Sequence, residues 1–159
     1  MVDEVNVLVL AAGNGSRMKS SAPKVLHHVA GQMMIDWVLD AVEPLSKNKP
    51  ITVIGVGAES VQAHVGKRSE FVLQSEQLGT GHAVQQAQAQ LESSHGVTLI
   101  MSGDTPMFRS ETLSEFIDEH NRSNNAVTVL TAIADDPTGY GRIVRADDDT
   151  VIKLSLIHI

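Results

Sequence analysis

Short runs of apolar, β-branched residues alternate along this chain with apolar stripes at helical spacing. The runs, bounded by glycine, proline or polar residues, predict buried strands, and the stripes, with apolar residues every three or four positions, predict amphipathic helices. The expected strands are residues 5–12, 51–56, 71–74, 97–102 and 126–134. The expected helices are residues 33–45, 59–65, 82–91 and one that Ser110 caps.

This alternation predicts an α/β fold, with βαβ units in a mostly parallel sheet that helices cover on both faces. In such sheets, ligands bind outside the carboxyl ends of the strands. The end of the chain departs from the pattern, because residues 142–146 and 150–154 predict a β-hairpin. We interpret the acidic run between them, residues 147–149, as a solvated turn rather than a metal site.

The amino-acid composition excludes several classes of protein. The 159 residues, 42% hydrophobic, are enough for one domain with a buried core. With 12 Lys and Arg against 19 Asp and Glu, the net charge is −7, which argues against a nonspecific nucleic-acid binder and means that local cations must hold any anionic ligand. The chain has no cysteine, and its longest apolar run, residues 7–12, is far shorter than a membrane span. Without a recognisable targeting segment, we expect a soluble, cytoplasmic protein.

The first candidate segment follows the first expected strand. Residues 13–18 read GNGSRM, and Pro23 and Lys24 come shortly after. Met18 stands where a dinucleotide fingerprint needs a glycine, and no Walker motif is present. What remains is a glycine turn whose backbone amides can approach a phosphate, with Arg17 and Lys24 as cations. An ordinary strand-to-helix turn with surface cations is the alternative.

The second candidate segment, residues 74–83, also follows a strand. Gly79 and Gly81 allow the backbone to approach a flat ligand, and Gln74 carries the donor and acceptor that a pyrimidine imide edge requires. The alternative is that Thr80 or Gly81 caps a helix and Gln74 lies on the surface.

The third candidate segment is residues 102–106, SGDTP, at the end of a strand. Asp104 follows a glycine that clears space, and Mg²⁺ takes one or two carboxylates together with waters and phosphates. A single aspartate is therefore a partial ligand set for Mg²⁺. In the alternative reading, Asp104 forms an Asx turn or caps a helix before Pro106.

The fourth candidate segment contains Gly139, Tyr140 and Gly141. It predicts a tight turn in which Tyr140 closes the edge of a pocket, or else a plain turn that enters a strand. The seven histidines show no metal-ligand spacing and receive no role, and only His82 lies beside a candidate segment. Without a Gly-x-Ser-x-Gly elbow or a cysteine nucleophile, covalent acyl chemistry is not expected.

The order of these motifs is more specific than any one of them. Together they resemble the sugar-nucleotide pyrophosphorylases, and within these the uridylyltransferase half of the bacterial bifunctional N-acetylglucosamine-1-phosphate uridylyltransferases and glucosamine-1-phosphate acetyltransferases. The resemblance extends over residues 5–153 and is most specific in two segments, QLGTGHA at 77–83 and GYGRI at 139–143. It implies a Rossmann-like nucleotide-diphospho-sugar transferase fold, incomplete at its C-terminus.

The resemblance also implies an activity: transfer of UMP from UTP to N-acetylglucosamine 1-phosphate, with Mg²⁺, giving pyrophosphate and UDP-N-acetylglucosamine for the cell envelope. Arg17, Lys24 and Asp104 would be catalytic, and Asp104 would bind the metal. The uridine site would include residues 10–13, and Gly141 would contact the sugar. The implied substrate-binding residues are Leu10, Ala11, Ala12, Gly13, Lys24, Gln74, Gly79, Thr80, Ser102, Gly103, Asp104, Tyr140 and Gly141.

The chain departs from that family near its end. After Lys153 we would expect Ile-Val-Glu, with a glutamate that contacts the sugar, but the chain reads Leu-Ser-Leu. We therefore interpret residues 1–153 as the N-terminal part of a pyrophosphorylase domain and 154–159 as a candidate non-native tail. The repeats that carry acetyl transfer and trimer formation in the family are not found in this sequence, so a homotrimer is expected only for a longer parent protein. We expect little catalysis from the fragment alone.

Two other functions remain open from the sequence. One keeps the chemistry but uses another hexose 1-phosphate, or dTTP or CTP in place of UTP. The other is a non-catalytic regulatory module that binds sugar nucleotides. The presence of Arg17, Lys24 and Asp104 favours an enzyme, because a sensor does not need cations at the reacting phosphate.

Overall fold

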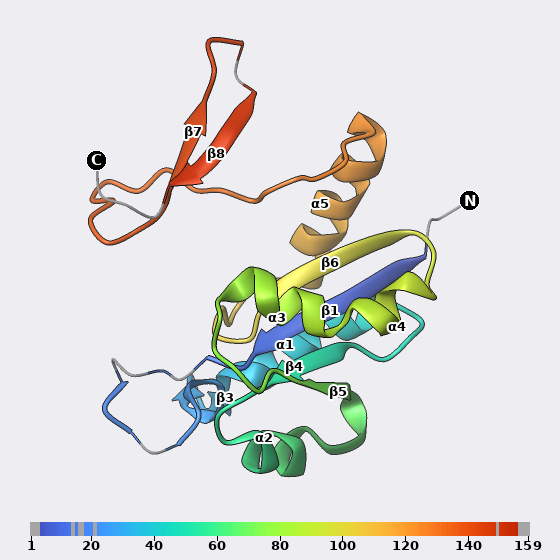
Figure 1. The fold of residues 1–159 in the computed structure, drawn as a ribbon, viewed down its shortest axis with the longest axis vertical. Helices are drawn as coiled ribbons and strands as arrows, with labels where there is room; N and C mark the ends of the chain where they lie inside the picture. Colours follow the sequence, from blue (N-terminus) through green and yellow to red (C-terminus); the bar gives the residue numbers. More distant parts are fainter. Residues whose placement is uncertain (1–3, 14, 16–17, 21, 149, 156–159) are drawn as a thin grey trace. The chain divides into compact units, whose positions relative to one another are not determined.

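A parallel four-stranded sheet forms the centre of the larger part of the protein (Figure 1). The computed structural model describes residues 4–13, 15, 18–20, 22–148 and 150–155. The chain divides into two units, residues 1–126 and 127–159. The sheet belongs to the first unit and has the strand order β5-β4-β1-β6. Its strands are β1 (Val5–Ala11), β4 (Ile51–Ile54), β5 (Glu70–Leu73) and β6 (Val97–Ser102).

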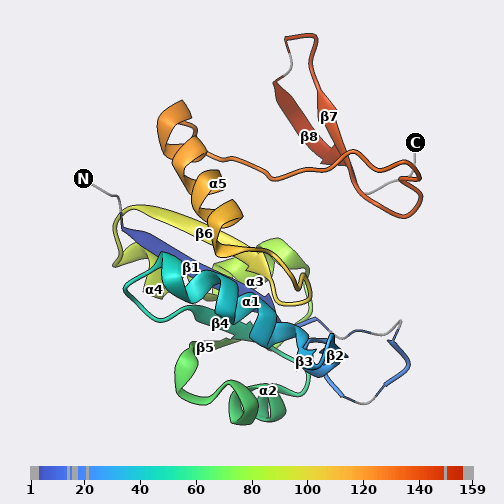
Figure 2. The same ribbon diagram turned by 180° about the vertical axis from the view of Figure 1, so that it is seen from behind.

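Helices cover both faces of this sheet, as Figures 1 and 2 show from opposite sides. Side chains of β1 alternate between the faces, so that Val7 and Val9 join one apolar cluster and Leu8 joins the other. Burial of both faces explains why β1 is almost continuously apolar. The helices on the Val7 face are α1 (Met34–Val42), α2 (Ala58–Val65) and α5 (Ser110–Ser123), and on the Leu8 face α3 (Thr80–Gln86) and α4 (Gln88–Glu92).

The order of the strands determines where a ligand can bind. From β1 the chain continues to β4 and β5 on one side, whereas β6 pairs with the other side of β1. The carboxyl ends of β1 and β6 therefore form a topological switch point, where α/β proteins bind their ligands. At this point the Gly103 N–H donates to the Leu10 carbonyl over 2.8 Å, and a Cβ at Gly103 would lie 3.1 Å from that oxygen. Glycine accommodates this close approach, because a Cβ would make a tight contact with the oxygen.

The predicted α/β class is confirmed, and four of the five predicted strands are present at or near their expected bounds. The helix predicted over 82–91 is two helices separated at Ala87, which leaves helical geometry at φ −92° and ψ 7°. The helix predicted over 33–45 ends as an α-helix at Val42 and continues as the 3₁₀ turn η3 (Glu43–Leu45). The prediction that Ser110 caps α5 is wrong, because Arg109 occupies the cap position and makes no side-chain cap.

The strand predicted over 126–134 is also wrong. These residues form neither strand nor helix, and Val127 and Ile133 are largely exposed. An apolar run becomes a strand only when a neighbouring strand supplies hydrogen bonds. In the described part of the chain, none of the strand pairs includes this run.

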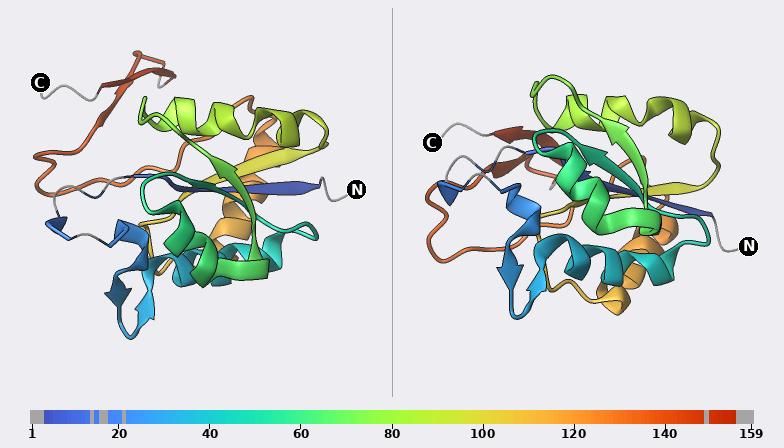
Figure 3. Two further views of the ribbon diagram at one scale, coloured as in Figure 1. Left: turned by 60° about the horizontal axis from the view of Figure 1, so that its bottom comes forward. Right: turned by 90° about the horizontal axis from the view of Figure 1, so that it is seen from below.

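The described residues include two hairpins, of which the sequence pattern predicts only the second. Strands β2 (His28–Val29) and β3 (Gln32–Met33) extend away from the sheet (Figure 3) and are too short to show alternation. In the second unit, β7 (Arg142–Arg145) and β8 (Val151–Ser155) pair antiparallel, which confirms the predicted hairpin. The Asp148 carboxylate accepts hydrogen bonds from the backbone N–H and hydroxyl of Thr150, as expected for a solvated turn.

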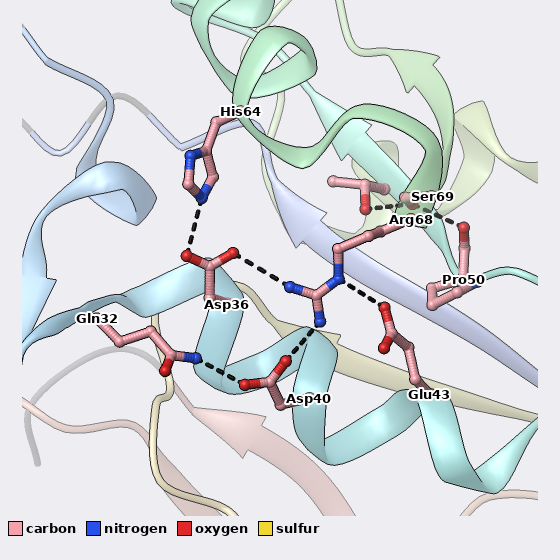
Figure 4. A network of polar contacts seen from close by, with 9 residues as sticks. Gln32, Asp36, Asp40, Glu43, Pro50, His64, Arg68 and Ser69 are labelled. Atoms are coloured by element: carbon pink, nitrogen blue, oxygen red, sulfur yellow. Dashed lines mark hydrogen bonds and ion pairs between the residues drawn. The ribbon is translucent and has the colours of Figure 1, made fainter.

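A network of charges ties α1 to the segment between α2 and β5 (Figure 4). Arg68, in the 3₁₀ turn η4 (Gly66–Arg68), bonds three carboxylates, at 3.3 Å to Asp36, 2.6 Å to Asp40 and 2.8 Å to Glu43. His64 of α2 contacts the Asp36 carboxylate as well, over 2.8 Å. A single guanidinium thus offsets part of the repulsion among three neighbouring carboxylates.

We predict that Arg68→Met destabilises the first unit by about 1–3 kcal/mol, because three neighbouring carboxylates lose their shared counter-charge. Urea denaturation followed by circular dichroism measures the change. Arg122→Met is the matched control, since Arg122 is exposed and forms only an i,i+3 pair with Glu119, worth at most about 0.5 kcal/mol. Equal losses in the two variants would contradict a structural role for the network.

Candidate functional site

A pocket of about 230 Å³ opens at the carboxyl ends of the central strands. Three of the four candidate segments contribute to it: the end of β1, the segment after β5 and the end of β6. Its walls are formed by Leu10, Ala11, Ala12, Gly13, Val25, Gln74, Gln77, Gly79, Thr80, Ala83, Ser102 and Asp104. Convergent polar groups in a concave site at the switch point of an α/β sheet indicate a ligand site.

Asp104 is the acidic residue among those that line this pocket. Lys24 Nζ lies 2.5 Å from Asp104 Oδ2, and the Ser102 hydroxyl donates to Oδ1 over 2.5 Å. Both carboxylate oxygens are therefore engaged by side chains from the end of β6 and from the loop after β1. Asp104 does not cap a helix, since α5 begins only at Ser110. The alternative of a helix cap is thus excluded.

The loop after β1 brings Lys24 to this position. Lys24 is the first residue of the 3₁₀ turn η2 (Lys24–Leu26), which Pro23 introduces in an extended conformation. Gly15 adopts φ +55°, and a Cβ there would lie 2.8 Å from Lys24 Cβ, so the glycine turn packs directly against Lys24. Arg17, the other predicted cation of this loop, lies outside the described residues.

The environment of Asp104 keeps its carboxylate ionised. Burial acts to raise the pKa of Asp104, but the hydrogen bonds from Lys24 and Ser102, together with the Lys24 charge, outweigh it. The pKa therefore lies below the ordinary value of 3.8. Among the described residues, no three His, Asp or Glu side chains form a group that could hold a metal. This donor set fits a Mg²⁺ ion that phosphates and waters share, rather than one held by the protein alone.

Gln74 also lines the pocket, and it follows β5, the outer strand farthest from β6. It is only 3% exposed, which excludes the surface position that the sequence left open. Its Nε2 donates to the Gly79 carbonyl over 3.1 Å and lies 3.0 Å from His82 Nδ1. The alternative cap at the start of α3 is also wrong, because Gly79 occupies the cap position with φ +97° and no side chain caps the helix. The fixed amide of Gln74 is thus a polar group presented in a largely apolar wall.

The structure brings most of the sequence-predicted site residues together. Gly103 lies under the turn that carries Asp104, and Lys24 contacts Asp104 without lining the pocket. Tyr140 and Gly141 belong to the second unit, so their part in this site stays a prediction. The predicted residues that line the pocket are Leu10, Ala11, Ala12, Gly13, Gln74, Gly79, Thr80, Ser102 and Asp104.

Three pocket residues were not predicted: Val25, Gln77 and Ala83. Val25 follows Lys24 directly, and Ala83 lies one helical turn after Gly79, so position in the motifs could have indicated both. Gln77 needs space that only the structure shows. A Cβ at Gly55 would lie 2.7 Å from Gln77 Nε2, so glycine at that position makes room for this side chain.

A parallel sheet of this order, with a pocket at its switch point and a cation beside a carboxylate, defines a Rossmann-like nucleotide-binding domain. The chain belongs to the MobA-like NTP transferase domain family, which it matches over residues 7–147. Two solved structures share the fold. A Bacillus anthracis protein, described as a candidate glucose-1-phosphate thymidylyltransferase and solved with sucrose, superposes with a TM-score of 0.78 at 17% identity over 96% of this chain and 64% of its own. Rv0371c from Mycobacterium tuberculosis superposes with a TM-score of 0.63 at 23% identity, over 74% of this chain and 61% of its own.

Curated relatives are more similar in sequence. The bifunctional protein GlmU of Lactobacillus delbrueckii is 51% identical over 95% of this chain and 33% of its own length. The GlmU protein of Enterococcus faecalis is 52% identical over 87% of this chain and 30% of its own length. The resemblance to the bacterial bifunctional enzymes is thereby confirmed, and the chain spans about a third of the length of these relatives. None of the helices in the described part of the chain is long and apolar enough to cross a membrane.

We predict that Asp104 contributes stability that is lost in acid. Because the folded-state pKa lies below the unfolded value, this contribution is present above about pH 4 and disappears as the pH falls through the folded pKa. Chemical denaturation between about pH 2 and 7 measures the free energy of unfolding. The parent chain should exceed Asp104→Asn by an amount that is constant near neutrality and shrinks below about pH 4, and it should exceed Lys24→Met with the same dependence on pH. If the difference in free energy does not change with pH, the Lys24–Asp104 pair is not its source.

Proposed function

We propose that this chain carries the nucleotide-binding part of a uridylyltransferase site, which transfers UMP from UTP to N-acetylglucosamine 1-phosphate. The products are pyrophosphate and UDP-N-acetylglucosamine. One observation supports this most: a single pocket is lined by both Gln74 and Asp104, and Asp104 is paired with Lys24. About 50% identity to proteins named GlmU supports the same assignment. We further propose a cytoplasmic location, and a homotrimer for a longer parent protein.

The base and ribose of UTP fit this pocket better than the whole nucleotide does. Its volume of about 230 Å³ is below the roughly 300–1,000 Å³ of sites that enclose a complete ligand. Leu10, Ala11 and Ala12 supply apolar walls at the end of β1, and Gly79 and Thr80 bring the backbone at the start of α3 to the pocket. The triphosphate would extend towards Lys24 and Arg17.

The reaction needs positioning and neutralisation of charge rather than a base. A sugar phosphate has a second pKa of about 6, so its attacking oxygen is already anionic at neutral pH. The main barrier is repulsion between two polyanions, which Lys24 and Arg17 would reduce while they hold the reacting phosphates in line. Asp104 would bind Mg²⁺, which neutralises phosphate charge when present. Tyr140 and Gly141 would contact the sugar.

We predict that Arg17→Ala and Lys24→Ala each reduce turnover on the order of 10²–10³-fold, because each removes a cation that offsets negative charge in the transition state. A coupled assay of pyrophosphate release with UTP, N-acetylglucosamine 1-phosphate and Mg²⁺ measures this. It is run on this chain, for which we expect little turnover, and on the full-length gene product. Thermal melting shows whether the variants stay folded.

The same pyrophosphate assay is run on a control variant and with competing substrates. Arg122→Met removes an exposed cation of α5 and should leave turnover unchanged. Glucose 1-phosphate, dTTP and CTP should react more slowly than the proposed pair. Near-normal activity of Arg17→Ala would remove Arg17 from the mechanism. Mg²⁺-dependent binding of UTP without any turnover in the full-length protein would instead indicate a regulatory module.

A further inference from the structure

The imidazole of His82 lies between two glutamine amides. Its Nδ1 is 3.0 Å from Gln74 Nε2, and its Nε2 is 3.1 Å from Gln86 Nε2. An amide nitrogen only donates hydrogen bonds, and a neutral imidazole has one acceptor nitrogen. Both contacts cannot therefore be satisfied with the amides in this orientation, so one of the two amide groups must present its oxygen to the ring.

The Gly79 carbonyl decides which amide turns. Gln74 Nε2 lies 3.1 Å from this carbonyl, which only accepts, so turning Gln74 would bring two oxygens together at a residue that is 3% exposed. Gln86 is only partly buried, and its second contact, to the backbone carbonyl of His82, is longer at 3.3 Å. Gln86 therefore turns and accepts from His82 Nε2–H. His82 Nδ1 is then the unprotonated nitrogen and accepts from Gln74.

This tautomer uses both hydrogens of the Gln74 amide group, one on Gly79 and one on His82. Gln74 Oε1 takes part in none of the hydrogen bonds found between the described residues, and Gln74 lines the pocket. The atom that Gln74 offers to a ligand is thus an acceptor only. We propose that His82 is a positioning residue that holds Gln74 in this orientation, so that the pocket selects a base with an N–H at the ring position that faces Gln74.

This inference rests on the proposed function and adds a reason for the choice of base. The imide edge of uracil carries an N–H at ring position 3, which can donate to Gln74 Oε1. Cytosine has an unprotonated nitrogen at that position, whose lone pair would face the same oxygen. A site built to accept an N–H discriminates strongly against a ligand that lacks it, because the buried acceptor then stays unpaired. UTP should therefore bind more tightly than CTP.

The test compares two substitutions of nearly equal size. The amide oxygen of asparagine branches from the same carbon position as Nδ1 of histidine, so His82→Asn keeps an acceptor for Gln74, whereas His82→Leu removes it. Titration calorimetry of this chain with UTP and with CTP, each with Mg²⁺, gives the ratio of the two dissociation constants. We expect a preference for UTP of about tenfold or more in the parent chain and in His82→Asn, and of about twofold or less in His82→Leu.

A second measurement needs no ligand. In ¹⁵N NMR spectra, His82 should show the tautomer with a hydrogen on Nε2, and Gln74→Leu should remove this preference, whereas Gln86→Met should preserve it. The opposite tautomer would overturn the inference, and so would a His82→Leu variant that binds UTP with the parent's preference. A parent chain that shows the expected tautomer but binds no UTP would overturn the proposed function, and the role of His82 in base selection with it.

Discussion

The close approach of β1 and β6 at their carboxyl ends is the constraint on which the site depends. The Gly103 N–H reaches the Leu10 carbonyl at 2.8 Å, and a Cβ at position 103 would lie 3.1 Å from that oxygen, a tight contact. Because β6 pairs with β1 in parallel, the segments that follow the two strands meet at one rim of the sheet and line the pocket there. Glycine accommodates this approach, and Asp104 emerges beside the end of β1, where Lys24 contacts it.

The position of Lys24 matters because this protein is acidic. With a net charge of −7, the chain as a whole repels polyanions, so the proposed binding of phosphates would need cations placed locally. The Lys24–Asp104 pair joins the loop after β1 to the end of β6 and keeps the Lys24 ammonium in position before a ligand arrives. Preorganisation of this kind reduces the conformational entropy that binding would otherwise cost. The Arg68 network, in contrast, uses its cation to neutralise carboxylates within the fold.

The sequence predicts the elements whose burial leaves a periodic pattern. The strand at 5–11 is almost fully buried, and the strand at 97–102 buries Leu99 and Met101. Both read as largely apolar runs, so the residues at their ends could be assigned to one rim. Two kinds of feature could not be predicted. The run 126–134 has the composition of a strand, but pairing depends on a neighbour that composition does not specify. The direction of the Gln74 amide depends on a carbonyl and an imidazole that meet only in three dimensions.

Gln74 and Asp104 reach one pocket from the two outer strands of the sheet, and this separation bears on how a nucleotide would lie in it. Gln74 follows β5 and Asp104 follows β6, with β4 and β1 between them. For the proposed ligand, UTP, the base would lie against Gln74, and the phosphates would extend past Asp104 towards Lys24. In the reverse direction, the phosphates would lie beside Gln74 and away from Lys24, so their charge would lack the local cation that binding to an acidic chain requires. The proposed direction of binding therefore follows from the order of the strands that carry the two side chains.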